Sequence, residues 1–236
     1  MSENIKKITK AFKVDLDSRE NQNIILKPSA RPFNNQAHQV NEVVEKIAEK
    51  IYKLIEGAKH PDDDIILNHN KIKEAFFSPF KPQLKDAQVF LSHSHADKNK
   101  ALKVKNYLES KTNHRVFIDS LFWDYKDNIM KEMSKYDNTS KIEDAFTLIL
   151  RESLQDMIEK CPYFVFLKSK NSVSDQELSR IAYSAWIYEE LKIAHSIRES
   201  RPTPMMESWQ VFHDISPFLE NLETITLKEL SQQINS

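Results

Sequence analysis

Short apolar runs recur through the last two thirds of the chain and are separated by segments of helical periodicity. Each run is four or five residues long and ends in polar residues, which is typical of a strand in a sheet. The predicted strands are 88–91, 115–119 and 163–167. The last of them is continuously apolar, as expected of a strand buried on both faces.

Helical patterns fill the segments between and after these strands, because apolar residues recur there at three- and four-residue spacing. The predicted helices are 97–110, 125–135, 142–160, 175–199 and 227–234, and 211–212 and 224–226 are possible short strands. Strands that alternate with helices predict an α/β fold, in which a central parallel sheet is flanked by helices.

The pattern is different before residue 86. The first 36 residues are polar and unpatterned, and they predict an irregular lead-in. A heptad-like apolar stripe then predicts a helix up to Glu56, which packs either on its own domain or on a partner. A connector with one short helix near 72–77 follows. The expected regions are an irregular lead-in at 1–36, a helical extension and connector at 37–85, and the α/β domain at 86–236.

Composition excludes several classes of function. The 236 residues carry a formal net charge of −1, which argues against a dominant nucleic-acid footprint. No apolar run approaches the roughly 20 residues of a membrane-spanning helix, and the polar start has no signal-peptide core. Cys161 is the one cysteine, which fits a reducing compartment. We expect a cytoplasmic protein that binds neither nucleic acid nor a membrane.

Glycine is nearly absent, and Gly57 is the single example. Both the G-x-G-x-x-G dinucleotide fingerprint and the P-loop need several glycines for close approach of the backbone to phosphates. A hydride-transferring Rossmann enzyme and a P-loop nucleotide hydrolase are therefore excluded.

The richest stretch runs from Val89 to Lys98 and reads V-F-L-S-H-S-H-A-D-K. An apolar strand delivers hydroxyls, imidazoles and a carboxylate to a loop, and a helix follows. Ligands of open α/β sheets bind beyond the carboxyl ends of the strands. A nucleotide and a zinc ion are the two ligands that this loop suggests.

The zinc interpretation rests on His93, His95 and Asp97, which resemble the start of the metallo-β-lactamase motif H-x-H-x-D-H. Two imidazoles and a carboxylate on one loop can ligate zinc. The closing histidine of that motif is replaced by Lys98, whose ammonium would repel a metal. We therefore expect no metal, and a zinc hydrolase is the less favoured alternative.

A second motif lies about ninety residues later, between Ser184 and Leu191. Trp186 and Glu190 are four residues apart on a predicted helix, so their side chains share one face. A carboxylate on a largely apolar helix needs a partner, and an ion pair at the helix margin is the simplest explanation. Periodicity does not choose between Glu189 and Glu190.

Taken together, four segments resemble the bacterial form of the Toll/interleukin-1 receptor (TIR) domain family, which has a flavodoxin-like fold. They are Phe90-Leu-Ser-His93, Val116-Phe-Ile-Asp-Ser120, Tyr163-Phe-Val-Phe-Leu167 and Ser184-x-Trp-x-x-x-Glu-Leu191. The segment Ser120–Tyr125 also resembles TIR-like proteins of bacterial anti-phage systems of the Thoeris type. The resemblance covers residue 86 to the end.

The resemblance implies an enzyme that cleaves the nicotinamide–ribose bond of NAD⁺, by hydrolysis to ADP-ribose or by cyclisation to a signalling nucleotide, in anti-phage immunity. It implies Glu190 as the catalytic carboxylate. The implied substrate-binding residues are Phe90, Ser92, His93, Ser94, His95, Asp119, Trp123 and Trp186. NAD⁺ is then the substrate, and no separate cofactor is needed.

The resemblance also implies self-association and a downstream effector that responds to the nucleotide product. The loop after the second strand usually carries a glycine in this family, and residues 122–128 have none. Assembly through that loop is therefore left open. A TIR scaffold that binds partners without turnover is the main alternative to the enzyme.

Overall fold

The computed structural model describes residues 10–27, 44–56, 69–79, 87–135, 140–176, 179–182, 185–196 and 213–235. They belong to two compact units. The first unit comprises Met1–Phe33, Asp86–Ser120 and Gln155–Ser236, and the second comprises Asn34–Lys85 and Leu121–Leu154. The units divide between Lys85 and Asp86, where a boundary was predicted, but 121–154 groups with Asn34–Lys85 and Met1–Phe33 groups with the sheet.

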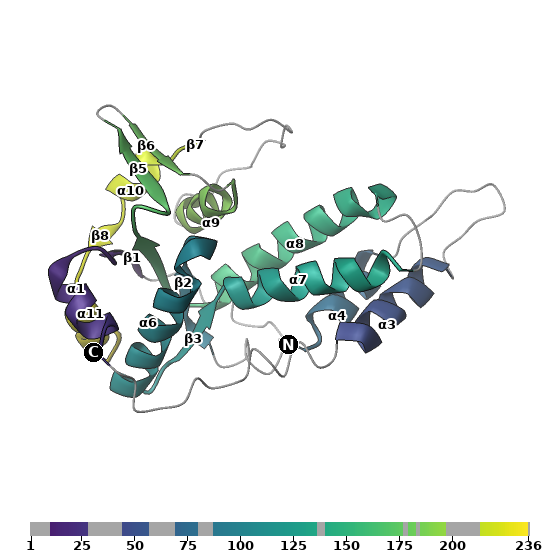
Figure 1. Ribbon diagram of the computed structural model, residues 1–236, viewed down its shortest axis with the longest axis horizontal. Helices are drawn as coiled ribbons and strands as arrows, with labels where there is room; N and C mark the ends of the chain where they lie inside the picture. Colours follow the sequence, from purple (N-terminus) through teal and green to yellow (C-terminus); the bar gives the residue numbers. More distant parts are fainter. Residues whose placement is uncertain are drawn as a thin grey trace. The chain divides into compact units, whose positions relative to one another are not determined.

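The first unit is built on a five-stranded sheet whose strand order is β3-β2-β4-β1-β8 (Figure 1). All of its pairings are parallel. The strands are β1 (Lys10–Asp15), β2 (Ala87–Ser92), β3 (Arg115–Ile118), β4 (Tyr163–Lys168) and β8 (Glu223–Thr224). The predicted α/β class, with a central parallel sheet flanked by helices, is confirmed.

Strand β1 corrects the prediction of an irregular lead-in over residues 1–36. It pairs with β4 along its whole length and with β8 on its other side. Phe12 and Val14 are fully buried, although lysines precede and separate the apolar positions. The helix α1 (Arg19–Ile25) follows, and the Ser18 hydroxyl caps it by accepting from the Asn21 amide at 3.3 Å. The polar composition of the first 36 residues did not indicate this central strand.

The strand order reverses at β2, which lies between β3 and β4. Numbered from β2, the strands β3, β2 and β4 follow the 2-1-3 start of the flavodoxin-like order. In that order the fourth position belongs to a later strand, and here β1 from the N-terminal segment occupies it. Such a reversal point is where open α/β sheets bind ligands, beyond the carboxyl ends of the strands.

Helices α6 (Lys98–Lys111), α1 and α11 (Leu227–Asn235) lie against one another beside this sheet. The apolar face of α6 is buried through Ala101, Val104 and Leu108. The amide of Leu227 donates to the Asn21 side chain at 2.9 Å, so α11 is tied to α1. The predicted closing helix at 227–234 is confirmed.

The predicted helix at 175–199 is wrong in its first half. There β5 (Val173–Gln176) and β6 (Ser179–Ala182) pair antiparallel, and β7 (His213–Asp214) pairs with β6. Helix α9 (Ala185–Ser196) begins only after it and lies against β6 and α10 (Ser216–Glu220). Cross-strand pairing outweighed the local helical pattern there. The possible strand at 211–212 lies outside the described residues.

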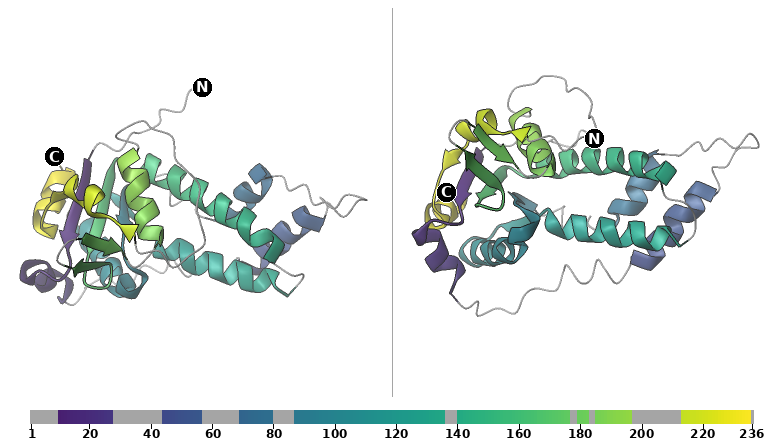
Figure 2. Two further views of the ribbon diagram at one scale, coloured as in Figure 1. Left: turned by 90° about the horizontal axis from the view of Figure 1, so that it is seen from above. Right: turned by 45° about the horizontal axis from the view of Figure 1, so that its top comes forward.

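The second unit contains α3 (Val44–Glu56), α4 (His69–Phe77), most of α7 (Ser120–Met133) and the first part of α8 (Ser140–Lys160) (Figure 2). The rings of Phe76 and Tyr125 pack edge to face with centroids 5.2 Å apart, joining α4 to α7. Lys73 lies 3.6 Å from Glu152, which joins α4 to α8. Helix α3 packs on α4 within this unit.

Residues 122–128, expected to form a loop, belong to helix α7. A helix interior has no need of glycine, which accounts for its absence from this segment.

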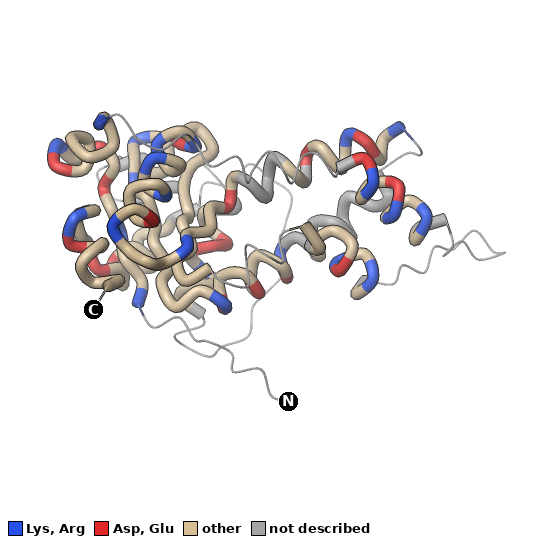
Figure 3. Tube along the Cα trace, turned by 90° about the horizontal axis from the view of Figure 1, so that it is seen from below, with Lys and Arg blue, Asp and Glu red and all other residues tan. Residues whose placement is uncertain are grey.

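Acidic and basic residues are interspersed along the described parts of both units (Figure 3). This distribution agrees with the near-neutral net charge. Among the described helices, none combines the length and the apolar character needed to cross a membrane.

Candidate functional site

Five buried polar side chains gather from the ends of two neighbouring strands and from one helix, and we call them the buried polar cluster. They are Ser92 and His93 at the end of β2, Asp119 and Ser120 after β3, and Glu190 on α9. None is more than 4% exposed. Polar side chains are seldom buried to this extent unless paired or functional.

The centre of the cluster is a contact between His93 and Asp119. Nδ1 of His93 lies 2.6 Å from Oδ1 of Asp119, and both side chains are withdrawn from solvent. Burial of the imidazole opposes its charged form, but the charge of Asp119, that of Asp97 and a contact with the Leu91 backbone outweigh it and raise the pKa of His93. The pair is therefore an imidazolium–carboxylate pair over a wider pH range than a free histidine would allow.

Glu190 is the second carboxyl group of the cluster. Complete burial raises its pKa well above the usual range, and the negative charge of Asp119 raises it further, while the Ser92 hydroxyl acts in the opposite direction. Two neighbouring carboxyl groups cannot both ionise without a nearby cation. Burial and the neighbouring charge thus favour the protonated form of Glu190, whereas the Asp119 carboxylate favours the charged form of His93.

Several polar atoms of the cluster have no hydrogen-bond partner among the described residues. They are the hydroxyls of Ser92 and Ser120, Nε2 of His93 and both carboxyl oxygens of Glu190. Buried polar groups are hydrogen-bonded in the great majority of cases, and leaving one unsatisfied costs about 1–3 kcal/mol. Several such groups in one place make this cluster a candidate polar site.

The structure distinguishes the two glutamates that periodicity could not. Oε1 of Glu189 lies 3.7 Å from Nζ of Lys192 on the same helix, the ion pair expected of a carboxylate at a helix margin. Lys192 also lies over the ring of Tyr188, 5.5 Å from its centroid. Glu190 instead faces the strand ends, so it is the glutamate of the cluster.

The three side chains of the zinc interpretation have different surroundings. His93 is buried beside Asp119, whereas His95 is exposed. Asp97 is buried, and its two oxygens accept hydrogen bonds from Ser169 and Asn171. No group of histidine, cysteine, aspartate and glutamate in the described part of the chain could hold a metal ion.

The other predicted site residues are divided between core and loop. Phe90 is fully buried and stacks on Phe117 and Phe164 with centroids 5.9 Å away in each case, so it packs the core below Ser92. Ser94 is half-buried. The backbones of Trp123 and Trp186 belong to α7 and α9, and their side chains lie outside the described ones.

Ser120 and Ser169 are two residues of this region that the sequence did not single out as site residues. Each directly follows a strand end, Ser120 next to Asp119 and Ser169 next to the last residue of β4. The sequence did carry a signal for them, because polar residues at the carboxyl ends of parallel strands meet at one edge of the sheet.

Compared with known proteins, the chain matches no family model, no characterised protein and no solved structure.

Proposed function

We propose that this chain is a TIR-type enzyme that cleaves the nicotinamide–ribose bond of NAD⁺, with Glu190 as the catalytic carboxyl group. The observation that carries the proposal is the fully buried Glu190, which lies beside Asp119 and Ser92 and whose carboxyl oxygens make no well-aligned hydrogen bond among the described residues. The cluster also lies where the strand order reverses, the usual ligand position in such sheets.

The chemistry of the bond suits a buried carboxyl group. Loss of nicotinamide leaves a ribose with oxocarbenium character, as in glycoside cleavage. A carboxylate in a water-poor site stabilises such developing positive charge far better than it could in bulk water. The hydroxyls of Ser92, beside Glu190, and of Ser120 are suited to hydrogen bonds with sugar hydroxyls.

The raised pKa of Glu190 is compatible with this role. NAD⁺ brings a cationic nicotinamide ring, and a nearby cation favours the ionised form of a carboxyl group. Binding of the substrate would therefore lower the pKa of Glu190 and release its proton, so that the carboxylate is formed when it is needed. Attack by water on the ribose then gives ADP-ribose, and attack by another group of the same nucleotide gives a cyclic product.

We assign this activity to the cytoplasm of a bacterium, in anti-phage signalling, with self-association of the chain and an effector that responds to the product. Cys161, the one cysteine of the sequence, is a buried thiol, as a reducing compartment allows.

The test is NAD⁺ consumption, followed by chromatography and mass spectrometry of the nucleotides. It uses the purified full chain and cells that express it, with and without phage infection. Glu190→Gln should lower turnover by at least about 100-fold, a usual effect of removing a catalytic acid or base. Glu189→Gln, which removes the charge of the neighbouring carboxylate paired with Lys192, is the matched control and should retain turnover.

Equal turnover by wild type and Glu190→Gln would overturn the assignment of Glu190. Absence of NAD⁺ consumption by the wild type, both purified and in infected cells, would overturn the activity and favour a TIR scaffold.

A further inference from the structure

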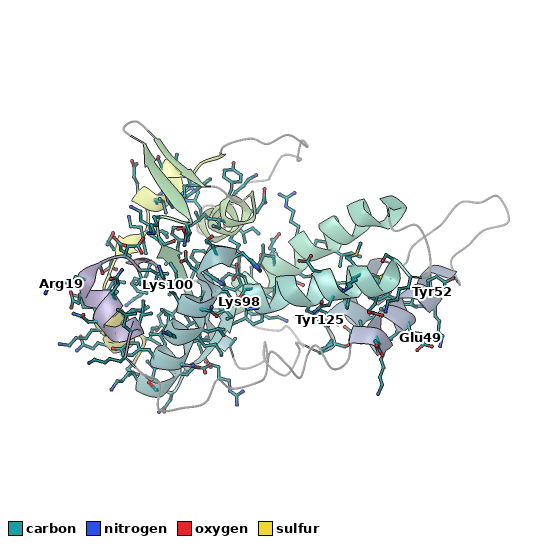
Figure 4. All side chains as sticks on the ribbon, in the orientation of Figure 1. Arg19, Glu49, Tyr52, Lys98, Lys100 and Tyr125 are labelled. Atoms are coloured by element: carbon teal, nitrogen blue, oxygen red, sulfur yellow. The ribbon has the colours of Figure 1, made fainter. Side chains whose placement is uncertain are left out.

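Three loops at the carboxyl edge of the sheet are joined through two carboxylates and one ammonium group. Asp17 follows β1, Asp97 lies in the short 3-10 helix His95–Asp97 after β2, and residues 169–172 follow β4. Lys100 lies on the first turn of α6 (Figure 4). Its Nζ is 3.3 Å from Asp17 and 3.4 Å from Asp97. These loops come from segments far apart in the sequence.

Asp97 joins the loop after β2 to the loop after β4. Only 2% of it is exposed. The Ser169 hydroxyl donates to Oδ2 of Asp97, and the Asn171 side-chain amide donates to Oδ1 at 2.9 Å. The β4 loop is itself fixed, because the Ser172 hydroxyl accepts from the Ser169 amide at 2.8 Å. Asp97 is therefore bound to a rigid partner.

Asp17 extends this connection to the N-terminal strand. It accepts from the backbone amide of Lys170 at 2.8 Å and pairs with Lys100. Partial burial opposes ionisation of Asp17, but the Lys170 amide and the Lys100 ammonium outweigh it and lower the pKa of Asp17. The carboxylate is thus held charged between the loops after β1 and β4.

The loop between His93 and Asp97 is consequently held at both ends. His93 contacts Asp119 at 2.6 Å, and Asp97 is held by Ser169 and Asn171. The negative charge of Asp97 also contributes to the raised pKa of His93. A displacement of Asp97 would therefore change both the position and the charge of a side chain in the buried polar cluster.

We propose that Asp97 is a positioning residue, which with Ser169, Asn171 and Lys100 clamps the β2 loop to the loops after β1 and β4 and thereby holds His93 in the buried polar cluster. Its consequence for catalysis rests on the proposed NAD⁺ cleavage, whereas the clamp itself does not. Through Asp17, the clamp connects the N-terminal segment to the loops that bound the buried polar cluster.

The experiment compares Asp97→Asn, Asn171→Ala and the control Asn99→Ala in the full chain. Asn99 is exposed on the first turn of α6, and the described residues give it no hydrogen bond. The readouts are titration of the His93 ring by NMR and hydrogen exchange of the Asp97 amide, which donates to the Ser94 carbonyl at 2.8 Å.

Asp97→Asn should lower the titration midpoint of His93, because a negative charge is removed. Asn171→Ala keeps that charge and removes one donor, so the Asp97 amide should exchange about tenfold faster than in Asn99→Ala. If Asp97→Asn does not fold, hydrogen exchange of the Asp97 amide in Asn171→Ala is the deciding measurement. An unchanged His93 midpoint in Asp97→Asn, or equal exchange in Asn171→Ala and Asn99→Ala, would overturn the clamp.

Where NAD⁺ is turned over, Asn171→Ala should lower kcat severalfold and leave KM close to that of the wild type, because the cluster is mispositioned but intact. Lack of turnover by the wild type would count against the proposed function only, since the titration and the exchange test the clamp without it.

Discussion

His93 Nδ1 and Asp119 Oδ1 lie 2.6 Å apart, and both side chains are buried. The contact follows from the parallel pairing of β2 with β3, in which Leu91 is opposite Ile118. The residues just beyond these strands are therefore neighbours at the carboxyl edge of the sheet. Because Asp119 raises the pKa of both His93 and Glu190, its charge links the two groups.

Asp119→Asn should lower the pKa of His93 and of Glu190, because one negative charge is removed from between them. NMR titration of the His93 ring tests the first effect. A folded pKa above the unfolded value of about 6.5 means that His93 contributes stability fully below that pH and loses it as the pH rises through the folded value. The stability difference between wild type and Asp119→Asn should therefore shrink at alkaline pH. A difference that is constant between pH 5.5 and 8.5 would contradict the charge link.

The wild type should become less stable as the pH rises, and Glu190→Gln should abolish this effect. The unfolded glutamate ionises above about pH 4.5, whereas the buried side chain keeps its proton, so the unfolded state is favoured progressively until the pH reaches the folded pKa. Urea unfolding between pH 4.5 and 8 measures this slope. Glu189→Gln should retain the slope of the wild type, and parallel curves for wild type and Glu190→Gln would refute the protonated state.

Phe12→Ala should destabilise the first unit by about 3–5 kcal/mol, since the ring is fully buried in a central strand. The control Lys10→Ala, at an exposed position of the same strand, should change stability by less than about 0.5 kcal/mol. Equilibrium unfolding in urea gives both values. Similar stabilities for the two variants would mean that β1 is peripheral to the sheet.

Phe76→Ala should destabilise the second unit by about 3–5 kcal/mol, because its buried ring packs against Tyr125 and joins α4 to α7. Hydrogen exchange measured by mass spectrometry should accelerate in peptides covering residues 69–77 and 120–133. Asn70→Ala, at an exposed position of α4, is the control and should leave exchange unchanged. Unaltered exchange in Phe76→Ala would remove α4 from the core of this unit.

The elements predicted well are those in which the local pattern and the tertiary environment agree. The segment 163–167 is apolar throughout, 88–91 is apolar from Val89 on, and they became the buried strands β4 and β2. The helix at 142–160 became α8 with nearly the same ends. The strands β5 and β6 were missed because their residues fit a helical period equally well, and only pairing between β5, β6 and β7 favours strands.

The candidate site divides in the same way. The polar residues after β2 and β3 were identified from the sequence, because a strand that ends in polar side chains exposes them at the edge of a parallel sheet. The choice of Glu190 over Glu189 rested on a family resemblance, since both lie near Trp186 on the helix. The structure separates them by their neighbours, Lys192 for Glu189 and Asp119 for Glu190.

By itself, the sequence determined the α/β class, the strands β2, β3 and β4, and the loop of histidines and serines between Ser92 and Asp97, because these depend on periodicity and on the residues next to strand ends. Only the tertiary structure decided that residues 10–15 form a central strand, that Asp97 is a buried anchor of the loops, and that Glu190 shares its surroundings with Asp119. Those features depend on contacts between distant segments, which local patterns do not encode.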